Sequence, residues 1–160
     1  MIKLIGDNNV LEAINLMDAS VAKDGFKSWV KNESAWITFF LELVNKQKQQ
    51  DPNVLVIGDY KEDKLRGFLA AATFSSTYNN APVMDVKDCI VDYNYNNAYT
   101  VYRLFDYMIA YIKEQGGKSW RAESVRGGED AINYGKFLAK RYNTETHISV
   151  RGVINGEENE

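Results

Sequence analysis

Three aspartates are the residues of this 160-residue chain whose type and spacing best suit acid–base chemistry. Asp85, Asp88 and Asp92 lie on or just after residues 81–91, an apolar stretch that is typical of a strand. A carboxylate held on a strand can accept a proton, so each is a candidate general base. Solvated charges at a strand edge are the alternative, since the sequence pairs none of them with a second catalytic group.

An Asn-rich and Tyr-rich turn follows this strand and leads into a helix. Apolar residues at helical spacing predict that helix, namely Val101, Leu104, Phe105, Met108, Ile109 and Ile112. The first backbone N–H groups of a helix lack intrahelical partners and carry the positive end of its dipole, so the turn is a candidate anion site. Asn and Tyr are also ordinary turn residues, so a plain strand-to-helix connection stays open.

One cysteine and one histidine limit metal and redox chemistry. A zinc site built from Cys and His needs more of both, so we predict no metal site. Cys89 lies in the apolar strand, without an activating base in the sequence, and is predicted to be a small buried side chain. His147 alternates with Ile148 and Val150, which favours a surface position on a strand.

Length, charge and hydropathy limit the class of protein to which the chain can belong. We predict a single domain over residues 1–154 and a flexible acidic tail over residues 155–160. A net charge of -3 without a run of Lys or Arg argues against nucleic acid and anionic membranes as partners. No stretch approaches the roughly 20 apolar residues of a membrane span, and no signal peptide is evident, so we expect a soluble, cytoplasmic protein.

The elements that must position these residues follow the order β, α, α, β, β, β, α, β, α, β. The predicted strands are residues 1–5, 53–59, 65–74, 81–91, 118–124 and 145–154. Asp7 is the predicted N-cap of the first helix, Asn32 opens the second, and Gly116 and Gly117 end the third. Alternation within residues 81–91 is imperfect, which predicts a bulge.

This order resembles the GNAT (general N-acetyltransferase) fold over nearly the whole chain. Residues 65–71, Leu-Arg-Gly-Phe-Leu-Ala-Ala, are similar to the third strand of that family. Residues 135–142, Gly-Lys-Phe-Leu-Ala-Lys-Arg-Tyr, are similar to its last helix and the aromatic residue that follows. The resemblance implies an α/β domain with a mixed central sheet of about six strands, flanked by four main helices.

The resemblance also implies acetyl-CoA as the cofactor, with its pyrophosphate on the backbone N–H groups of the Asn-rich turn. The family pattern Gln/Arg-x-x-Gly-x-Gly/Ala places Asn96, Tyr99 and Val101 at its three defined positions, and all three depart from it. A Tyr side chain there would block the phosphate unless it points away, and a positive φ would be strained. The cofactor-binding candidates are Asn96, Asn97, Ala98, Tyr99, Thr100 and Val101.

The activity that the resemblance implies is transfer of an acetyl group to a primary amine. A carboxylate or water acts as the base, for which Asp88 and Asp92 are the candidates, and often a Tyr protonates the leaving thiolate. The family position of that Tyr falls on Phe137, which cannot donate a proton. Tyr134, one turn earlier, is the candidate acid if the alignment shifts.

The departures leave a second function open. A GNAT-like protein that has lost transfer chemistry would bind no cofactor and would serve as a binding or structural component, for example of a bacteriophage particle. Its location would then be the host cytoplasm or the virion. Tyr95, Tyr99 and Tyr102 cluster at the turn, and Tyr is favoured at interfaces, so we predict a protein partner or a homo-oligomer there. Partial burial of these tyrosines against neighbouring loops is the alternative.

Overall fold

The structure is a computed structural model that describes residues 1–24, 33–75, 81–95, 97–123 and 128–147. It divides the chain into two units, residues 1–125 and residues 126–160. The first unit contains a sheet and three helices, and the second contains one described helix, α4 (Gly128–Ala139). The single domain predicted over residues 1–154 stays a prediction.

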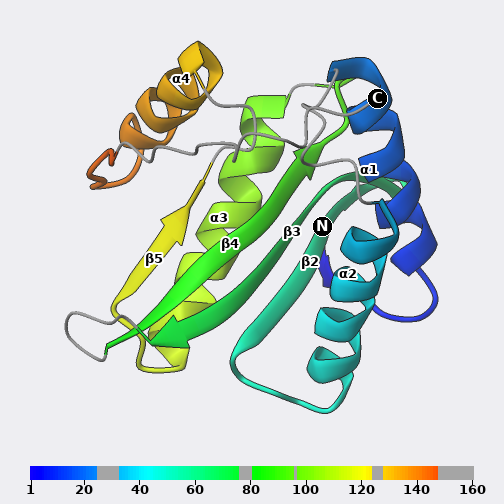
Figure 1. Cartoon of the computed structure of the whole chain (residues 1–160), viewed down its shortest axis with the longest axis horizontal. Coiled ribbons are helices and arrows are strands. Elements are labelled where there is room, and N and C mark those ends of the chain that lie inside the picture. Colours follow the sequence, from blue (N-terminus) through cyan, green and yellow to red (C-terminus); the bar gives the residue numbers. More distant parts are fainter. Residues whose placement is uncertain (25–32, 76–80, 96, 124–127, 148–160) are drawn as a thin grey trace, which may run out of the picture. The chain divides into compact units, whose positions relative to one another are not determined.

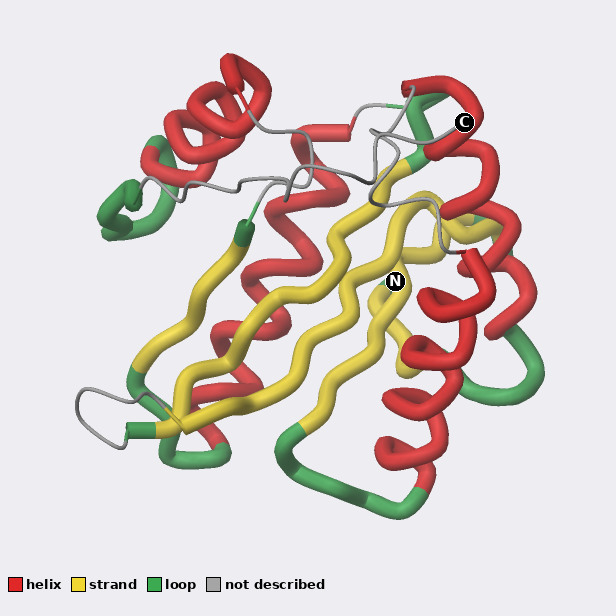
Figure 2. Tube along the Cα trace, viewed as in Figure 1, coloured by secondary structure: helices red, strands yellow, loops and turns green. Residues whose placement is uncertain are grey.

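The first unit is built on a mixed sheet with the strand order β1-β2-β3-β4-β5 (Figure 1, Figure 2). Neighbouring strands are antiparallel from β1 to β4, whereas β5 is parallel to β4. The bounds are β1 (Ile2–Leu4), β2 (Val54–Lys61), β3 (Lys64–Ser75), β4 (Pro82–Val91) and β5 (Ser119–Ala122). The predicted mixed α/β architecture is therefore confirmed.

The described residues form five strands, and the prediction of about six is wrong in this respect. The predicted closing strand begins at Glu145, but residues 145–147 have no regular secondary structure. The rest of that strand, residues 148–154, lies outside the described residues. Alternating apolar residues indicate a strand only where a sheet edge accepts the segment, and residues 145–147 pair with none of the described strands.

The helices cover both faces of the sheet. α1 (Val10–Asp24) and α2 (Glu33–Lys48) pack on one face, where their apolar side chains form a core with Val54 and Val56 of β2. α3 (Asn97–Glu114) packs on the other face (Figure 1). Because side chains alternate along a strand, residues 55 and 57 point toward α3. Burial on both faces explains why β2 is a continuous apolar run.

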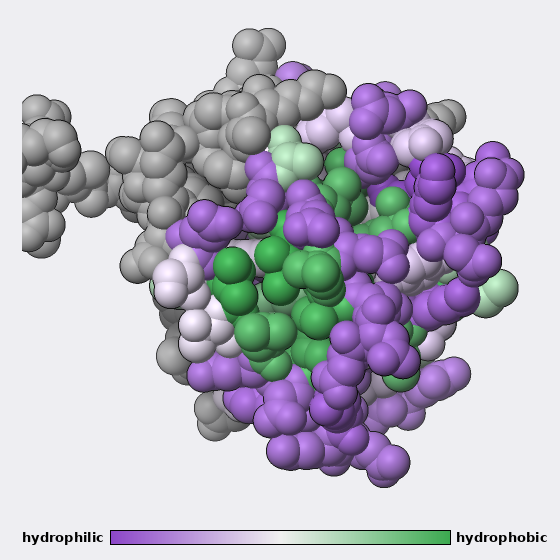
Figure 3. Space-filling view, turned by 90° about the vertical axis from the view of Figure 1, so that its right-hand side faces the viewer, coloured by the Kyte–Doolittle hydropathy of each residue, from purple (hydrophilic) through white to green (hydrophobic). Residues whose placement is uncertain are grey.

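Apolar side chains also reach the outer surface of the helix pair. Figure 3 shows hydrophobic residues gathered on the side of the molecule where α1 and α2 lie, with hydrophilic residues around them. The exposed large apolar side chains of these two helices are Leu11, Phe39 and Leu41. No helix in the described part of the chain has the length and apolar character that a membrane crossing requires.

The ends of α1 and α3 test the predicted helix signals. The Asp7 cap is wrong, because α1 begins three residues later at Val10 and the Asn9 side chain accepts the hydrogen bond from the Gly6 N–H at 2.7 Å. Asp7 instead pairs with Lys48 of α2 at 2.6 Å. The glycine stop after α3 is confirmed, since Gly116 has a φ of 75°, which favours a residue without a Cβ.

β4 contains a bulge, as the imperfect alternation of residues 81–91 predicts. The bulge changes the face of the sheet on which Asp88 lies relative to Asp85. Ala70 of β3 pairs with Asp88, whereas the next residue, Ala71, pairs with Val86, so Lys87 is the extra residue. Residues three apart on a regular strand point to opposite faces. The bulge places Asp85 and Asp88 on the same face of the sheet, the one that α1 and α2 cover.

Candidate active site

The site begins where β4 and β5 part. The two strands pair over Val83–Val86 and Ser119–Ala122, and β5 ends there while β4 continues to Val91. Residues 87–91 of β4 therefore pair with β3 on one side and with no described strand on the other. Backbone N–H and C=O groups along such an edge are available to an extended ligand. Asp88 lies within this stretch.

Asp85 has a structural role that removes it from the candidate bases. Its side chain is buried and accepts two hydrogen bonds from Arg121 of β5, each at 3.1 Å, and it also pairs with Lys87. Burial alone would raise the pKa of Asp85, but the hydrogen bonds from Arg121 and Lys87 outweigh it and lower that pKa. Asp85 thus stays ionised as the anchor of β5.

Asp88 has the surroundings of a base. The indole N–H of Trp36 on α2 donates a hydrogen bond to its Oδ2 at 3.0 Å. Burial raises the pKa of Asp88 to about 6, although the Trp36 hydrogen bond and the charge of Lys87 act in the opposite direction. A carboxylate with such a pKa is ionised at neutral pH and still takes up a proton readily, which is what general base catalysis requires.

Asp92 shapes the turn that follows β4. Its backbone N–H donates to the Arg66 carbonyl oxygen at 2.8 Å, and its Oδ1 accepts hydrogen bonds from the backbone and side-chain nitrogens of Asn94 at 3.0 and 2.9 Å. These contacts are those of an Asx-type turn, and they explain why a short polar residue ends the strand. The assignment of Asp92 as a base stays a prediction.

The first turn of α3 presents the cofactor-binding candidates. Ala98 and Tyr99 are exposed, whereas Thr100 and Val101 are buried against the sheet. Asn96 and the side chain of Asn97 lie outside the described residues. Tyr99 is 63% exposed, and its ring lies 5.5 Å from the Arg103 guanidinium, one helical turn farther along. The Tyr99 side chain therefore points away from the free N–H groups, and its φ is not positive.

Gly67 of β3 allows the first turn of α3 to sit directly on the sheet. A Cβ at this position would lie 2.8 Å from Thr100 Cγ2 and 2.9 Å from the carbonyl oxygen of Ile90. Both separations are too short for non-bonded carbon and oxygen atoms, so another side chain here would displace α3 or β4. The close approach places the N-terminus of α3 at the carboxyl end of β4.

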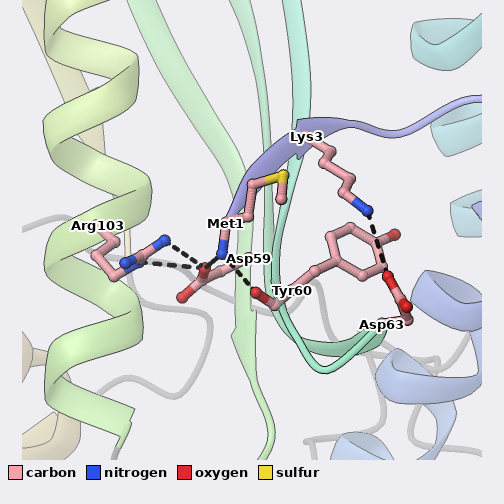
Figure 4. A network of polar contacts seen from close by, with 6 residues as sticks. All are labelled: Met1, Lys3, Asp59, Tyr60, Asp63 and Arg103. Atoms are coloured by element: carbon pink, nitrogen blue, oxygen red, sulfur yellow. Dashed lines mark hydrogen bonds and ion pairs between the residues drawn. The ribbon is translucent and has the colours of Figure 1, made fainter.

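A buried ion pair holds the flank of α3 that faces β2 (Figure 4). Oδ1 of Asp59 accepts hydrogen bonds from Arg103 at 3.2 and 3.1 Å, and the Met1 amino group lies 3.3 Å from the same oxygen. The Met1 amino group also donates to the carbonyl oxygen of Tyr60, and Lys3 pairs with Asp63 at 3.6 Å. Sequence patterns missed Asp59, whose only signal is a charge at the end of an apolar strand.

Arg66 provides a cation beside the turn. Its guanidinium lies 3.4 Å from the centre of the Tyr95 ring, and the residue is 8% exposed. Its Nε is buried and has no hydrogen-bond partner among the described residues. A buried donor without an acceptor is costly, so the site suits an anionic group that would accept this hydrogen bond.

The remaining predicted site residues are placed as follows. Burial, and in second place the charge of Asp88, raise the pKa of the partly buried Cys89 to about 12, so its thiol is protonated and a poor nucleophile. His147 is exposed, as predicted, but it does not lie on a strand. Tyr134 lies on α4 in the second unit, so its role as the acid stays a prediction. Within the described residues, no three His, Cys, Asp or Glu side chains are grouped as metal ligands.

Several solved structures are similar in fold to nearly the whole chain. A predicted acetyltransferase of Clostridium acetobutylicum, solved with acetyl-CoA, has a TM-score of 0.72 and 8% identity, over 96% of this chain and 95% of that chain. An aminoglycoside acetyltransferase from an uncultured soil metagenomic sample has a TM-score of 0.69 and 16% identity, over 98% and 96%. The sequence matches no protein-family model and no curated protein.

The chain therefore has the GNAT acetyltransferase fold. A transcriptional regulator of Bacillus halodurans is also similar, with a TM-score of 0.70 and 12% identity over 96% of this chain and 99% of that chain. Proteins described with different activities thus share this architecture, and the activity of the present chain must be argued from its own site.

Proposed function

We propose that the chain is an N-acetyltransferase that transfers the acetyl group of acetyl-CoA to a primary amine. One observation carries the proposal: Asp88, with a pKa of about 6, lies on the stretch of β4 that has no β5 partner. A carboxylate that can take up a proton thus lies beside a strand edge that no described strand covers, in a fold whose solved neighbours include acetyltransferases.

Three groups are suited to hold acetyl-CoA: the edge of β4, the first turn of α3 and the side chain of Arg66 on β3. The free edge of residues 87–91 offers backbone N–H and C=O groups to the extended pantetheine arm. The first turn of α3 offers N–H groups to the pyrophosphate, without an acidic residue in that turn to repel it. Arg66, whose Nε has no hydrogen-bond partner within the described part of the chain, adds a positive charge near Tyr95 on that side of the turn.

Asp88 would act on the acceptor. The cofactor supplies a thioester whose carbonyl carbon the amine attacks, so that a C–N bond forms and the C–S bond breaks. Asp88 takes the proton that the amine nitrogen loses, and the thiolate that leaves needs a proton in return. Tyr134 is the candidate donor of that proton, with solvent as the alternative.

Calorimetry with acetyl-CoA and CoA tests the binding step. Micromolar affinity is the expected result, and no detectable heat at millimolar ligand would contradict the proposal. That second outcome would favour the GNAT-like protein without transfer chemistry. Light scattering of the Tyr99→Ala variant would then test whether the exposed tyrosines of the turn mediate self-association, since loss of an oligomer is the expected effect.

Release of the CoA thiol in the presence of a panel of primary amines tests the chemistry. Asp88→Asn should reduce kcat/KM by about 100-fold or more, because general base catalysis contributes about that much. Asp63→Asn is the matched control, since the Asp63 side chain is 97% exposed on the turn between β2 and β3. Equal activity of the two variants would contradict the role of Asp88.

A further inference from the structure

The carboxylate of Asp88 is oriented by a side chain far away in the sequence. Trp36 and Asp88 are separated by 52 residues, yet the indole Nε1 lies 3.0 Å from Asp88 Oδ2. Within the described part of the chain, this is the one hydrogen bond donated to the Asp88 carboxylate. Among the described residues, none donates a hydrogen bond to the other oxygen, Oδ1.

Aromatic packing fixes the direction of that indole N–H. The Trp36 ring is stacked on Phe40 of the same helix, with centroids 5.0 Å apart and an angle of 13° between the planes. Phe68 of β3 packs against both rings, at 6.4 Å from Trp36 and 5.4 Å from Phe40. Phe40 and Phe68 are fully buried, so the indole has little freedom to rotate.

We infer that Trp36 is a positioning residue for Asp88: it binds Oδ2, fixes the plane of the carboxylate and directs Oδ1 toward the acceptor amine. This inference rests on the proposed function of Asp88 as a base. A side chain held by one hydrogen bond from a rigid partner keeps a single rotamer, which lowers the entropic cost of reaching the reactive geometry. A residue of α2 thus orients the proposed base on β4.

The same hydrogen bond tunes the proton affinity of the base. Burial raises the pKa of Asp88 to about 6, and Trp36 is the largest of the influences that lower it. The positive charge of Lys87, whose Nζ also pairs with Asp85, lowers the Asp88 pKa as well. Its neighbour Cys89 stays neutral, and its cross-strand partner on β3 is the apolar Ala70. Without Trp36, the carboxylate would hold its proton to a higher pH.

The Trp36→Phe variant tests the inference because it keeps an aromatic ring next to Phe40 and removes the N–H donor together with the five-membered ring that carries it. The first readout is the pKa of the Asp88 side-chain carboxyl, followed by ¹³C NMR against pH. We expect an increase of about one pH unit, the size of a lost hydrogen bond to a charged group. Trp120→Phe is the matched control, since Trp120 packs edge-on against Phe105 on the other face of the sheet.

The second readout is the dependence of kcat/KM on pH. The acidic limb of the profile should move upward by the same amount in Trp36→Phe, so that activity falls about five-fold near pH 6 and largely recovers near pH 9. A variant that was merely less stable would lose activity without this shift. Trp120→Phe should leave the limb in place.

These readouts separate failure of the inference from failure of the proposed function. An unchanged Asp88 pKa in Trp36→Phe would overturn the inference, whatever the activity. If the pKa moves but the pH profile does not, Asp88 is not the base and the positioning role is overturned with it. If the wild-type protein transfers no acetyl group although its Asp88 pKa depends on Trp36, the proposed function fails and the positioning role falls with it.

Discussion

Arg121 on β5 forms two hydrogen bonds with Asp85 on β4, one rung before the last pair of these parallel strands. The guanidinium also lies 4.7 Å from the centre of the Phe74 ring. This pair anchors β5 just before the point where β4 loses its described neighbour on that side, while it stays paired with β3 on the other. The free edge that carries Asp88 thus begins at a rigid position.

Replacing Arg121 with Met should lower the free energy of unfolding by about 1–2 kcal/mol at pH 7, because the buried Asp85 carboxylate then keeps Lys87 alone among its described partners. The expected loss is modest since half of the Arg121 side chain is exposed. Urea unfolding measures the change. Arg121→Lys should lose less, and equal stability of all three proteins would contradict the anchoring role.

The Asp85 ion pair also sets the response to acid. The folded-state pKa of Asp85 is below its ordinary value of about 3.9, so the pair stabilises the fold above that pH, and this contribution is lost as the pH falls through the folded-state pKa. The stability of Arg121→Met should therefore depend less on pH on the acidic side. Thermal unfolding from pH 5 down to pH 2 tests the difference.

Asp88 should show the opposite dependence. Its folded-state pKa of about 6 lies above the ordinary value, so its contribution to stability is present below about pH 4 and is lost as the pH rises through 6. Asp88→Asn should remove this loss and raise the free energy of unfolding at pH 7.5 by about 1–3 kcal/mol, while it lowers kcat/KM by about 100-fold or more. A variant that is both inactive and less stable at pH 7.5 would indicate a structural role instead.

Local patterns in the sequence predict most of the elements, because periodicity records which side of a helix or strand is buried. The apolar stripe of α3, the continuous run of β2 and the bulge of β4 are examples. The same periodicity counts Trp36 among the core residues of its helix and contains no sign that its N–H meets Asp88. That pairing depends on the docking of α2 on β4, which no local pattern encodes.

Buried polar pairs are the least predictable part of the site for the same reason. In the sequence, Asp59 is only the last residue of a predicted strand, yet it receives hydrogen bonds from Arg103 of α3. The predicted start of α1 at Asp7 is wrong because the Asp7 side chain pairs with Lys48 of α2, a contact that the local sequence does not show.

Gly67→Ala adds only one methyl group, but it should displace the first turn of α3. The added Cβ meets Thr100 at 2.8 Å and the Ile90 backbone at 2.9 Å, so we expect a loss of about 1–3 kcal/mol in the free energy of unfolding and weaker binding of acetyl-CoA. Gly6→Ala is the matched control, because a Cβ there meets no atom within 4 Å. Thermal unfolding and calorimetry on both variants measure the two effects. Similar behaviour of the two would contradict the close contact of α3 with β3.

Substitutions of Arg66 and of Tyr99 should differ in their effect on the affinity for acetyl-CoA. Arg66→Gln removes the charge whose Nε lacks a partner, so affinity should fall about ten-fold, as for the loss of one charge-assisted hydrogen bond. Tyr99→Ala should leave affinity within about two-fold, because the Tyr99 ring extends toward Arg103 and solvent. Calorimetry at two salt concentrations measures both, and the effect of Arg66→Gln should shrink at high salt. A gain of affinity in Tyr99→Ala would instead show that this side chain obstructs the turn, and the departure from the family pattern would then act against cofactor binding.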